Sequence, residues 1–240
     1  MLFPQDIIET LANCAYWADK EIRSELSDGI IETENDYTSN LTGALRREIN
    51  SRNIENLRAT VKILSPTLER ENGADACIIF ENTTHFKVGI FEAKWPRLKT
   101  HKDYWDSIQK RTRQSHFHDQ LTRQSMQAHV LAVWEMFYCE YSYGKQPDFM
   151  EDDLSTCVWH SDALTASNSR SSNTTPWTDI ELQKLLSAHK TNLPDIVRQI
   201  CECTQGQLLQ KKSHQNTFED FGLPQTALVI SYNADFNDKS

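Results

Sequence analysis

Residues 73 to 94 read GADACIIFENTTHFKVGIFEAK, and this stretch decides the fold that we expect for the whole chain. Two apolar runs, ADACIIF and HFKVGIFEAK, are separated by the polar segment ENTT, which has the right length for a turn between antiparallel strands. If the turn is centred between Thr83 and Thr84, Asp75 lies directly opposite Glu92, with Cβ atoms about 5 Å apart. Lys94 follows two residues after Glu92 and therefore projects from the same face.

Two carboxylates that face each other across a strand pair repel unless a cation lies between them. A hard, oxygen-seeking ion such as Mg²⁺ removes the repulsion, and Mn²⁺ can substitute for it. Proteins hold Mg²⁺ with one or two carboxylates and leave other positions to water and substrate phosphates. Asp75 and Glu92 beside Lys94 therefore indicate phosphoryl chemistry. The alternative is a cross-strand salt bridge between Asp75 and Lys94 at a sheet edge, worth at most about 1 kcal/mol when exposed.

The chain on either side of this hairpin predicts an α/β fold rich in helix. Apolar residues at helical spacing predict helices over 5–27 and 36–50, and one long helix from 103 to about 141. Apolar and β-branched runs predict strands at 58–65, 155–160 and 227–232. Thr175 as a cap, Pro176 and a capping box from Thr178 to Glu181 predict a late helix, and Pro194 opens another that ends near Gly206. Glycine and proline number only seven each, which also favours helix.

Three segments follow from this pattern. Residues 1–160 form the core with its N-terminal helix. Residues 161–175, SDALTASNSRSSNTT, carry little apolar surface and are expected to form a flexible surface loop that could act as a lid. Residues 176–240 form a helical C-terminal part with a late strand, packed on the same domain.

The hairpin residues resemble the PD-(D/E)XK nuclease superfamily, whose restriction-endonuclease-like fold has a central mixed β-sheet flanked by helices. Its pattern is an acid on the first hairpin strand, an acid-x-Lys on the second and then a helix with polar residues facing the site. Here GADACIIF supplies Asp75, and IFEAK supplies Glu92 and Lys94. Ala74 replaces the proline that names the motif. The resemblance runs from about Glu34 to Cys157, roughly half the chain, and C-terminal helices are additional to it.

This resemblance implies further site residues. The carbonyl of Ala93 would join Asp75 and Glu92 around the metal. The opening helix of many such nucleases contributes an acid, for which Glu34 is the favoured candidate and Glu48, on the same helical stripe, the runner-up. The helix after the hairpin would close the site with Gln120. The alternative for Glu34 or Glu48 is a helix-end or surface carboxylate, which is favourable near a helix start without any catalytic role. The alternative for Gln120 is a position on a solvated helix face.

The distribution of charge bears on the partner. Net charge is −9. The segment from Lys87 to Gln124 nevertheless holds nine basic and four acidic residues, a net +5 that leaves −14 elsewhere. Such polarity suits one basic face for a polyanion, although a solvated basic helix without a partner has the same composition. The residues expected to grip a nucleic-acid backbone are Arg97, Lys99, Lys102, Arg113, Arg123 and Gln124.

Cellular context is also constrained by the sequence. The six cysteines lack framework spacing and are expected to be reduced thiols. Cys201 and Cys203 with the nearby His189 and His214 suggest zinc, but residues two apart on a helix diverge by about 200°. With neither a secretory signal nor a membrane span, the protein is expected in the cytoplasm.

Together these features predict a Mg²⁺-dependent DNA endonuclease of a restriction or phage-defence type. Two alternatives stay open: a member of the same fold that binds nucleic acid or protein without cutting, and a nuclease acting on RNA or structured DNA. Many nucleases of this fold act as dimers, so a homodimer or a partner subunit is a further expectation.

Overall fold

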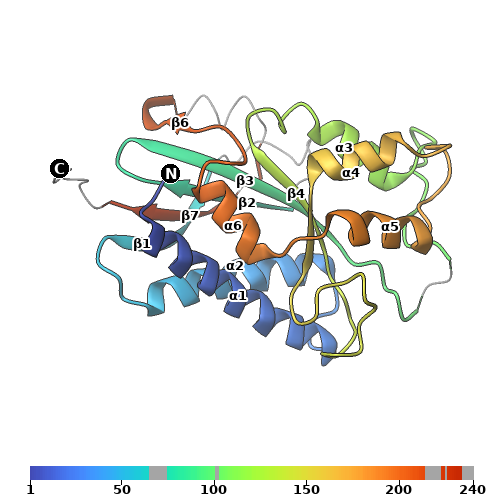
Figure 1. Ribbon diagram of the computed structural model, residues 1–240, viewed down its shortest axis with the longest axis horizontal. Helices are drawn as coiled ribbons and strands as arrows, with labels where there is room; N and C mark the ends of the chain where they lie inside the picture. Colours follow the sequence, from blue (N-terminus) through green and yellow to red (C-terminus); the bar gives the residue numbers. More distant parts are fainter. Residues whose placement is uncertain (65–74, 101–102, 214–222, 225, 234–240) are drawn as a thin grey trace.

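The computed structural model describes residues 1–64, 75–100, 103–213, 223–224 and 226–233, and its core is a mixed seven-stranded sheet flanked by helices (Figure 1). In chain order its elements are α1 (Gln5–Ser27), α2 (Glu34–Ser51), β1 (Leu57–Ile63), β2 (Ala76–Glu81), β3 (His85–Lys94), α3 (His116–Gln124), β4 (Ala132–Phe137), β5 (Thr156–Trp159), α4 (His160–Asn168), α5 (Asp179–His189), α6 (Leu193–Cys201), β6 (Leu209–Gln210), the 3₁₀ turn η1 (Lys211–Ser213) and β7 (Thr226–Tyr232).

The strand order is β1-β7-β2-β3-β4-β5, with β6 paired to β3 outside this path. The late strand β7 lies between β1 and β2, antiparallel to the first and parallel to the second. The C-terminal part of the chain therefore contributes to the central sheet itself. No helix in the described ranges is long and apolar enough to cross a membrane.

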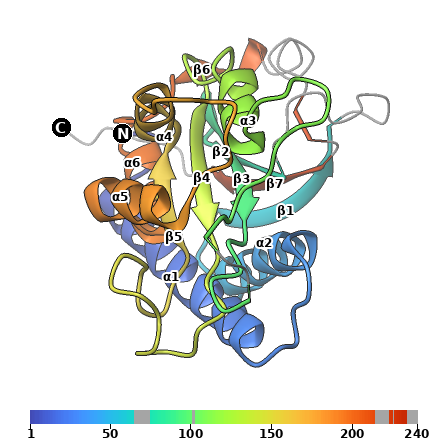
Figure 2. The ribbon, with the colours of Figure 1, turned by 90° about the vertical axis from the view of Figure 1, so that its right-hand side faces the viewer.

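Helices cover the two faces of the sheet separately. On one face α1, α2 and α6 pack against side chains such as Phe91 and Trp134 in the largest core cluster. On the other face α3, α4 and α5 bury Phe117, Leu121 and Leu182 against Phe137 of β4. Figure 2 shows α3 and α2 on opposite sides of the strands. This second face is the one that carries Glu92 and Lys94, because side chains alternate along β3.

Several predicted elements are confirmed. Helices α1 and α2 cover the predicted ranges 5–27 and 36–50, and β1, β5 and β7 match the three predicted strands. The capping box between Thr178 and Glu181 is present, and Pro194 lies in the first turn of α6. Two details differ from the prediction. Helix α6 ends at Cys201 and not near Gly206, and α5 is capped by Thr178 and not by Thr175.

The single long helix predicted over 103–141 is wrong. Only α3 is helical there, and residues 132–137 form β4, a strand with every residue buried between β3 and β5. A strand buried on both faces shows no alternation of polar and apolar residues, so a helix period fits it equally well. Leu131, Trp134 and Tyr138 have such helical spacing by coincidence.

The flexible loop predicted over 161–175 is also wrong in its first half, since residues 160–168 form α4. Its second half is held in place by Arg170, whose guanidinium bonds the Glu181 carboxylate at 2.8 Å and stacks on Trp177 at 4.9 Å from the ring centroid. The composition of this segment did not predict the helix, because a few buried residues, among them Ala163 and Ser167, are enough to pack a short helix against the protein.

Candidate active site at the end of the hairpin

The register of the hairpin matches the predicted one. Ala76 pairs with Phe91 and Phe80 pairs with Lys87, which centres the turn between Thr83 and Thr84. Asp75 directly precedes β2, and its backbone N–H donates to the carbonyl of Phe91 at 3.0 Å. Asp75 thus continues the ladder and lies opposite Glu92.

The hairpin carboxylates are held by nearby donors. Asp75 Oδ2 accepts a hydrogen bond from the backbone N–H of Ala93 at 2.8 Å. Glu92 Oε1 accepts from Lys94 Nζ at 2.9 Å and from the side-chain amide of Gln120. Glu92 Oε2 is buried and has no hydrogen-bond partner among the residues described. One oxygen of Glu92 is therefore fixed by the protein, while the other has unused capacity to accept a proton or a cation.

The electrostatics of the pair reflect its burial. Glu92 and Lys94 are only 5% and 8% exposed. Burial raises the pKa of Glu92 to about 8, with the Asp75 and Glu135 carboxylates adding to the rise and Lys94 opposing it. Burial disfavours the charge of Lys94, but Glu92 and Glu135 outweigh it and hold the pKa of Lys94 above its ordinary value. The ammonium group of Lys94 is thus kept charged between two glutamates.

Helix α2 brings Glu34 to the same place. Thr33 caps this helix by accepting a hydrogen bond from Asp36 N–H, so Glu34 is the first helical residue. Its Oε1 accepts from the backbone N–H of Trp95 at 2.5 Å. Burial raises the pKa of Glu34, while the Trp95 N–H and Lys94 oppose the rise. Glu48 lies about 21 Å further along the helix axis and pairs with Arg52, so Glu34 is the acid that meets the hairpin.

The first turn of α3 is fixed in front of the hairpin. Ser115 caps the helix by accepting a hydrogen bond from His118 N–H at 3.1 Å. Phe117 is buried and makes an edge contact with Phe137 of β4. This anchoring points Gln120 toward Glu92 and leaves His116 half-buried, where burial and the charge of Lys94 lower the pKa of its imidazole.

These side chains enclose a small cavity of about 190 Å³. Five of the residues that the sequence singled out line it: Glu34, Asp75, Glu92, Lys94 and Gln120. Aromatic and polar residues complete its wall: Trp95, Trp105, Asp106, Ser107, His116 and Phe117. A larger hollow of about 940 Å³ lies between α1 and residues 148–154, but it contains none of these five.

Sequence reasoning missed Glu135 and His160. Glu135 on β4 pairs in parallel register with Glu92, so both side chains lie on the face covered by α3. It is fully buried, neither carboxylate oxygen has a hydrogen-bond partner within the described part of the chain, and His160 Nδ1 lies 3.7 Å from Oε1. Glu135 was hidden because its segment was assigned to a helix. A lone glutamate in the apolar run AVWEMF was the available signal.

Most of the residues expected to contact nucleic acid interact with other residues of the chain or are buried. Lys99 donates through its Nζ to the carbonyl of Glu140 at 2.7 Å and through its N–H to that residue's carboxylate. Arg123 pairs with Asp119 at 3.2 Å, and Gln124 is fully buried. Arg97 stacks on Trp95 at 4.1 Å. Lys102 lies outside the described residues, and Arg113 is exposed on a turn before α3.

The chemistry of the donors suits a hard divalent cation. Asp75 and Glu92 offer carboxylate oxygens, and the unpartnered Oε2 of Glu92 is an acceptor that a cation would satisfy. Among the described residues, no three His, Cys, Asp or Glu side chains are grouped as a metal site. Cys201 and Cys203 are free thiols, and His214 of the zinc hypothesis lies outside the described ranges. Mg²⁺ needs no more than two carboxylates when substrate phosphate and water complete its shell.

Comparison of this chain with protein-family models, with curated proteins and with solved structures finds no match. Conclusions about activity therefore depend on the geometry of the cavity and its residues.

Proposed function

We propose that this protein is a Mg²⁺-dependent nuclease of the PD-(D/E)XK type with a restriction-endonuclease-like core, most suited to cutting DNA in a restriction or phage-defence system. The observation that carries the proposal is the convergence of Asp75, Glu92 and Lys94, together with Glu34 and Gln120, on one cavity. These residues come from α2, two hairpin strands and α3, so their meeting is a tertiary property. A spacing coincidence in the sequence would not produce it.

In this proposal Asp75 and Glu92, with the Ala93 carbonyl and Glu34, would hold the cation. A divalent cation held there would supply a Lewis acid for a water molecule and positive charge beside the phosphate. The donors Lys94 and Gln120 fix one carboxylate oxygen of Glu92, which keeps the other directed away from them. The Lys94 ammonium also stabilises negative charge that develops on the phosphate during attack. Trp95 and Trp105 in the cavity wall limit the access of bulk water.

The test is cleavage of plasmid, linear duplex, single-stranded DNA and RNA in Mg²⁺ or Mn²⁺. Wild type is expected to cut in a metal-dependent way, whereas Asp75→Ala and Lys94→Ala lose at least a hundredfold in rate. Glu48→Gln is the matched control, since it removes a carboxylate at the far end of α2 and should cut like wild type. Cleavage that survives in both site variants would show that the activity lies elsewhere.

The outcomes also separate the alternatives. No cleavage of any substrate, together with retained DNA binding, would favour a silent binding member of the fold. Preference for RNA would move the proposal to an RNA nuclease. Conversion of plasmid directly to linear product, rather than through a nicked circle, would indicate two copies acting together on the two strands.

A further inference from the structure

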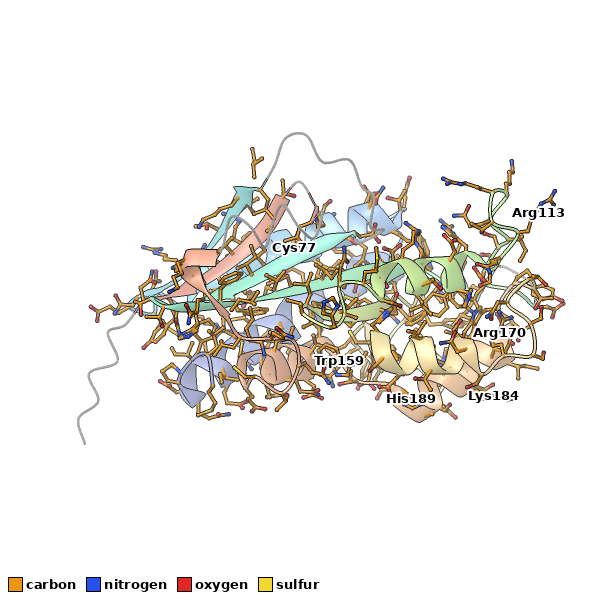
Figure 3. All side chains as sticks on the ribbon, turned by 90° about the horizontal axis from the view of Figure 1, so that it is seen from above. Cys77, Arg113, Trp159, Arg170, Lys184 and His189 are labelled. Atoms are coloured by element: carbon orange, nitrogen blue, oxygen red, sulfur yellow. The ribbon has the colours of Figure 1, made fainter. Side chains whose placement is uncertain are left out.

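A short hairpin-like loop, residues 108–115, lies at the rim of the candidate cavity. Ile108 and Ser115 form its base as an isolated bridge, and Gln109 N–H donates to the carbonyl of Gln114 at 2.8 Å. Its tip carries three exposed bases, Lys110, Arg111 and Arg113. Figure 3 shows Arg113 projecting from the end of the molecule, beyond the helices that cover the sheet. We refer to residues 108–115 as the basic tip.

The base of the tip belongs to the cavity wall. Ser107 and His116 directly flank the tip, line the cavity and are joined by a hydrogen bond from His116 N–H to the Ser107 carbonyl at 2.8 Å. A second bond, from Ser115 N–H to the Asn173 carbonyl at 2.8 Å, ties the tip to the segment before α5. The tip is therefore held at a fixed position beside the cavity.

The positive charge of the tip is not offset locally. Lys110, Arg111 and Arg113 form no ion pair with any acid in the described parts of the chain. The nearby acids have other partners than these three bases: Asp106 accepts from Ser115 Oγ at the base of the tip at 2.6 Å, and Asp119 pairs with Arg123. A cluster of three solvated bases on a chain of net charge −9 is a local attractor for a polyanion.

The dimensions of the tip suit a nucleic-acid strand. Ser107 and Lys110 are three positions apart in the sequence, so their Cα atoms lie within about 10 Å of each other. Phosphates of one DNA strand advance about 3.4 Å each along the helix axis, so the tip and the cavity lie within about three phosphates of each other. A strand held by the tip would present a nearby phosphodiester to the cavity.

We infer that the basic tip binds the phosphodiester backbone of a nucleic-acid strand, independently of sequence, next to the cavity. The inference rests on the proposed function for the role of the cavity, but the binding surface is tested without cleavage. Phosphate contacts of this kind carry no sequence information and are weakened by salt, because each contact releases condensed counterions.

The experiment measures binding of a labelled random-sequence 30-base-pair duplex by fluorescence anisotropy in EDTA, over a range of KCl concentrations. The test variant is Lys110→Gln/Arg111→Gln/Arg113→Gln. The matched control is Arg46→Gln/Arg47→Gln/Arg58→Gln, which removes the same charge from exposed positions on α2 and β1. Circular dichroism verifies that both fold.

The tip variant should bind at least tenfold more weakly, and the slope of log K against log salt should fall by about 2 to 3. The control should change binding less than threefold. Equal effects in the two triple variants, no effect in either, or no binding by wild type would each overturn the inference. Tip-dependent binding of polyglutamate without binding of the duplex would overturn it in favour of an acidic protein partner. Tip-dependent binding by a wild type that fails to cut would keep this surface and remove the nuclease function.

Discussion

Glu135 provides the sharpest test of whether the buried polar groups beside the cavity serve function or stability. Its carboxyl group is fully buried, its oxygens accept no hydrogen bond from the residues that the structure describes, and His160 Nδ1 lies 3.7 Å from Oε1. We predict that Glu135→Gln raises the stability of the fold and lowers the rate of cleavage. A residue kept only for packing would leave the stability nearly unchanged, because the two side chains have almost the same shape.

The magnitude follows from the burial. A buried carboxyl group without hydrogen bonds costs about 1 to 3 kcal/mol in desolvation, of which an amide of the same shape recovers a part. A gain of about 1 kcal/mol corresponds to about 2 to 4 °C in Tm for a chain of this size. Cleavage should fall about ten- to a hundredfold, as for other changes behind a metal site, because Glu135 is one of the two glutamates that hold Lys94 charged.

The assay combines thermal unfolding with single-turnover cleavage. Glu140→Gln is the matched control: Glu140 is also buried, but its oxygens accept from Lys99 N–H at 2.6 Å and from Trp95 Nε1 at 3.1 Å. It should lower Tm, since a satisfied carboxylate is lost. A lower Tm for Glu135→Gln, or unchanged cleavage beside an active wild type, would refute the reasoning.

Three further predictions concern the scaffold. Burial raises the pKa of Asp19 from 3.8 to about 6, so between these pH values the folded state binds a proton that the unfolded state has lost. The free energy of unfolding should therefore fall by about 3 kcal/mol as pH rises through this window. Asp19→Asn should remove this pH dependence in urea titrations. In Gly89→Ala the new Cβ would lie 2.9 Å from the Trp134 ring, and a loss of about 1 to 3 kcal/mol should appear in the same titrations; wild-type stability would show that the ring can move. Arg170→Ala, which removes the bond to Glu181, should speed limited proteolysis within 169–178, and an unchanged rate would mean that this segment is held by other contacts.

Local rules predicted the hairpin and its register correctly. The turn position alone determined the register, because cross-strand partners follow from the centre of a short turn. The same register places Asp75 opposite Glu92, and helical periodicity places Gln120 on the polar side of α3. The resemblance favoured Glu34 over Glu48, but both lie on one stripe of α2, and only the docking of that helix in the structure places Glu34 beside the hairpin.

Non-local packing determined what the sequence could not predict. For Lys99 the sequence offered only a charge, whereas in the structure its Nζ donates to the carbonyl of Glu140, which lies 41 residues away along the chain. Likewise, α4 forms in a Ser-, Thr- and Asn-rich segment because neighbouring elements bury Ala163. In both cases the deciding contact joins positions that no periodicity relates.

The error over β4 also explains why Glu135 escaped notice, and it shows what signal would have revealed it. On β3 the face toward α3 carries Ile90 and then the polar Glu92, while on β4 it carries Val133 and then Glu135. The parallel register pairs Ile90 with Val133 and Glu92 with Glu135, so the change from apolar to polar occurs at one level across both strands. A single polar substitution in a buried strand is easily explained as a tolerated defect. Glu92 and Glu135, however, are paired with each other across two strands and form a continuous polar row under α3. Apolar side chains in these positions would stabilise the fold more. That alignment argues for retention by function, and it becomes visible only when β4 is assigned as a strand.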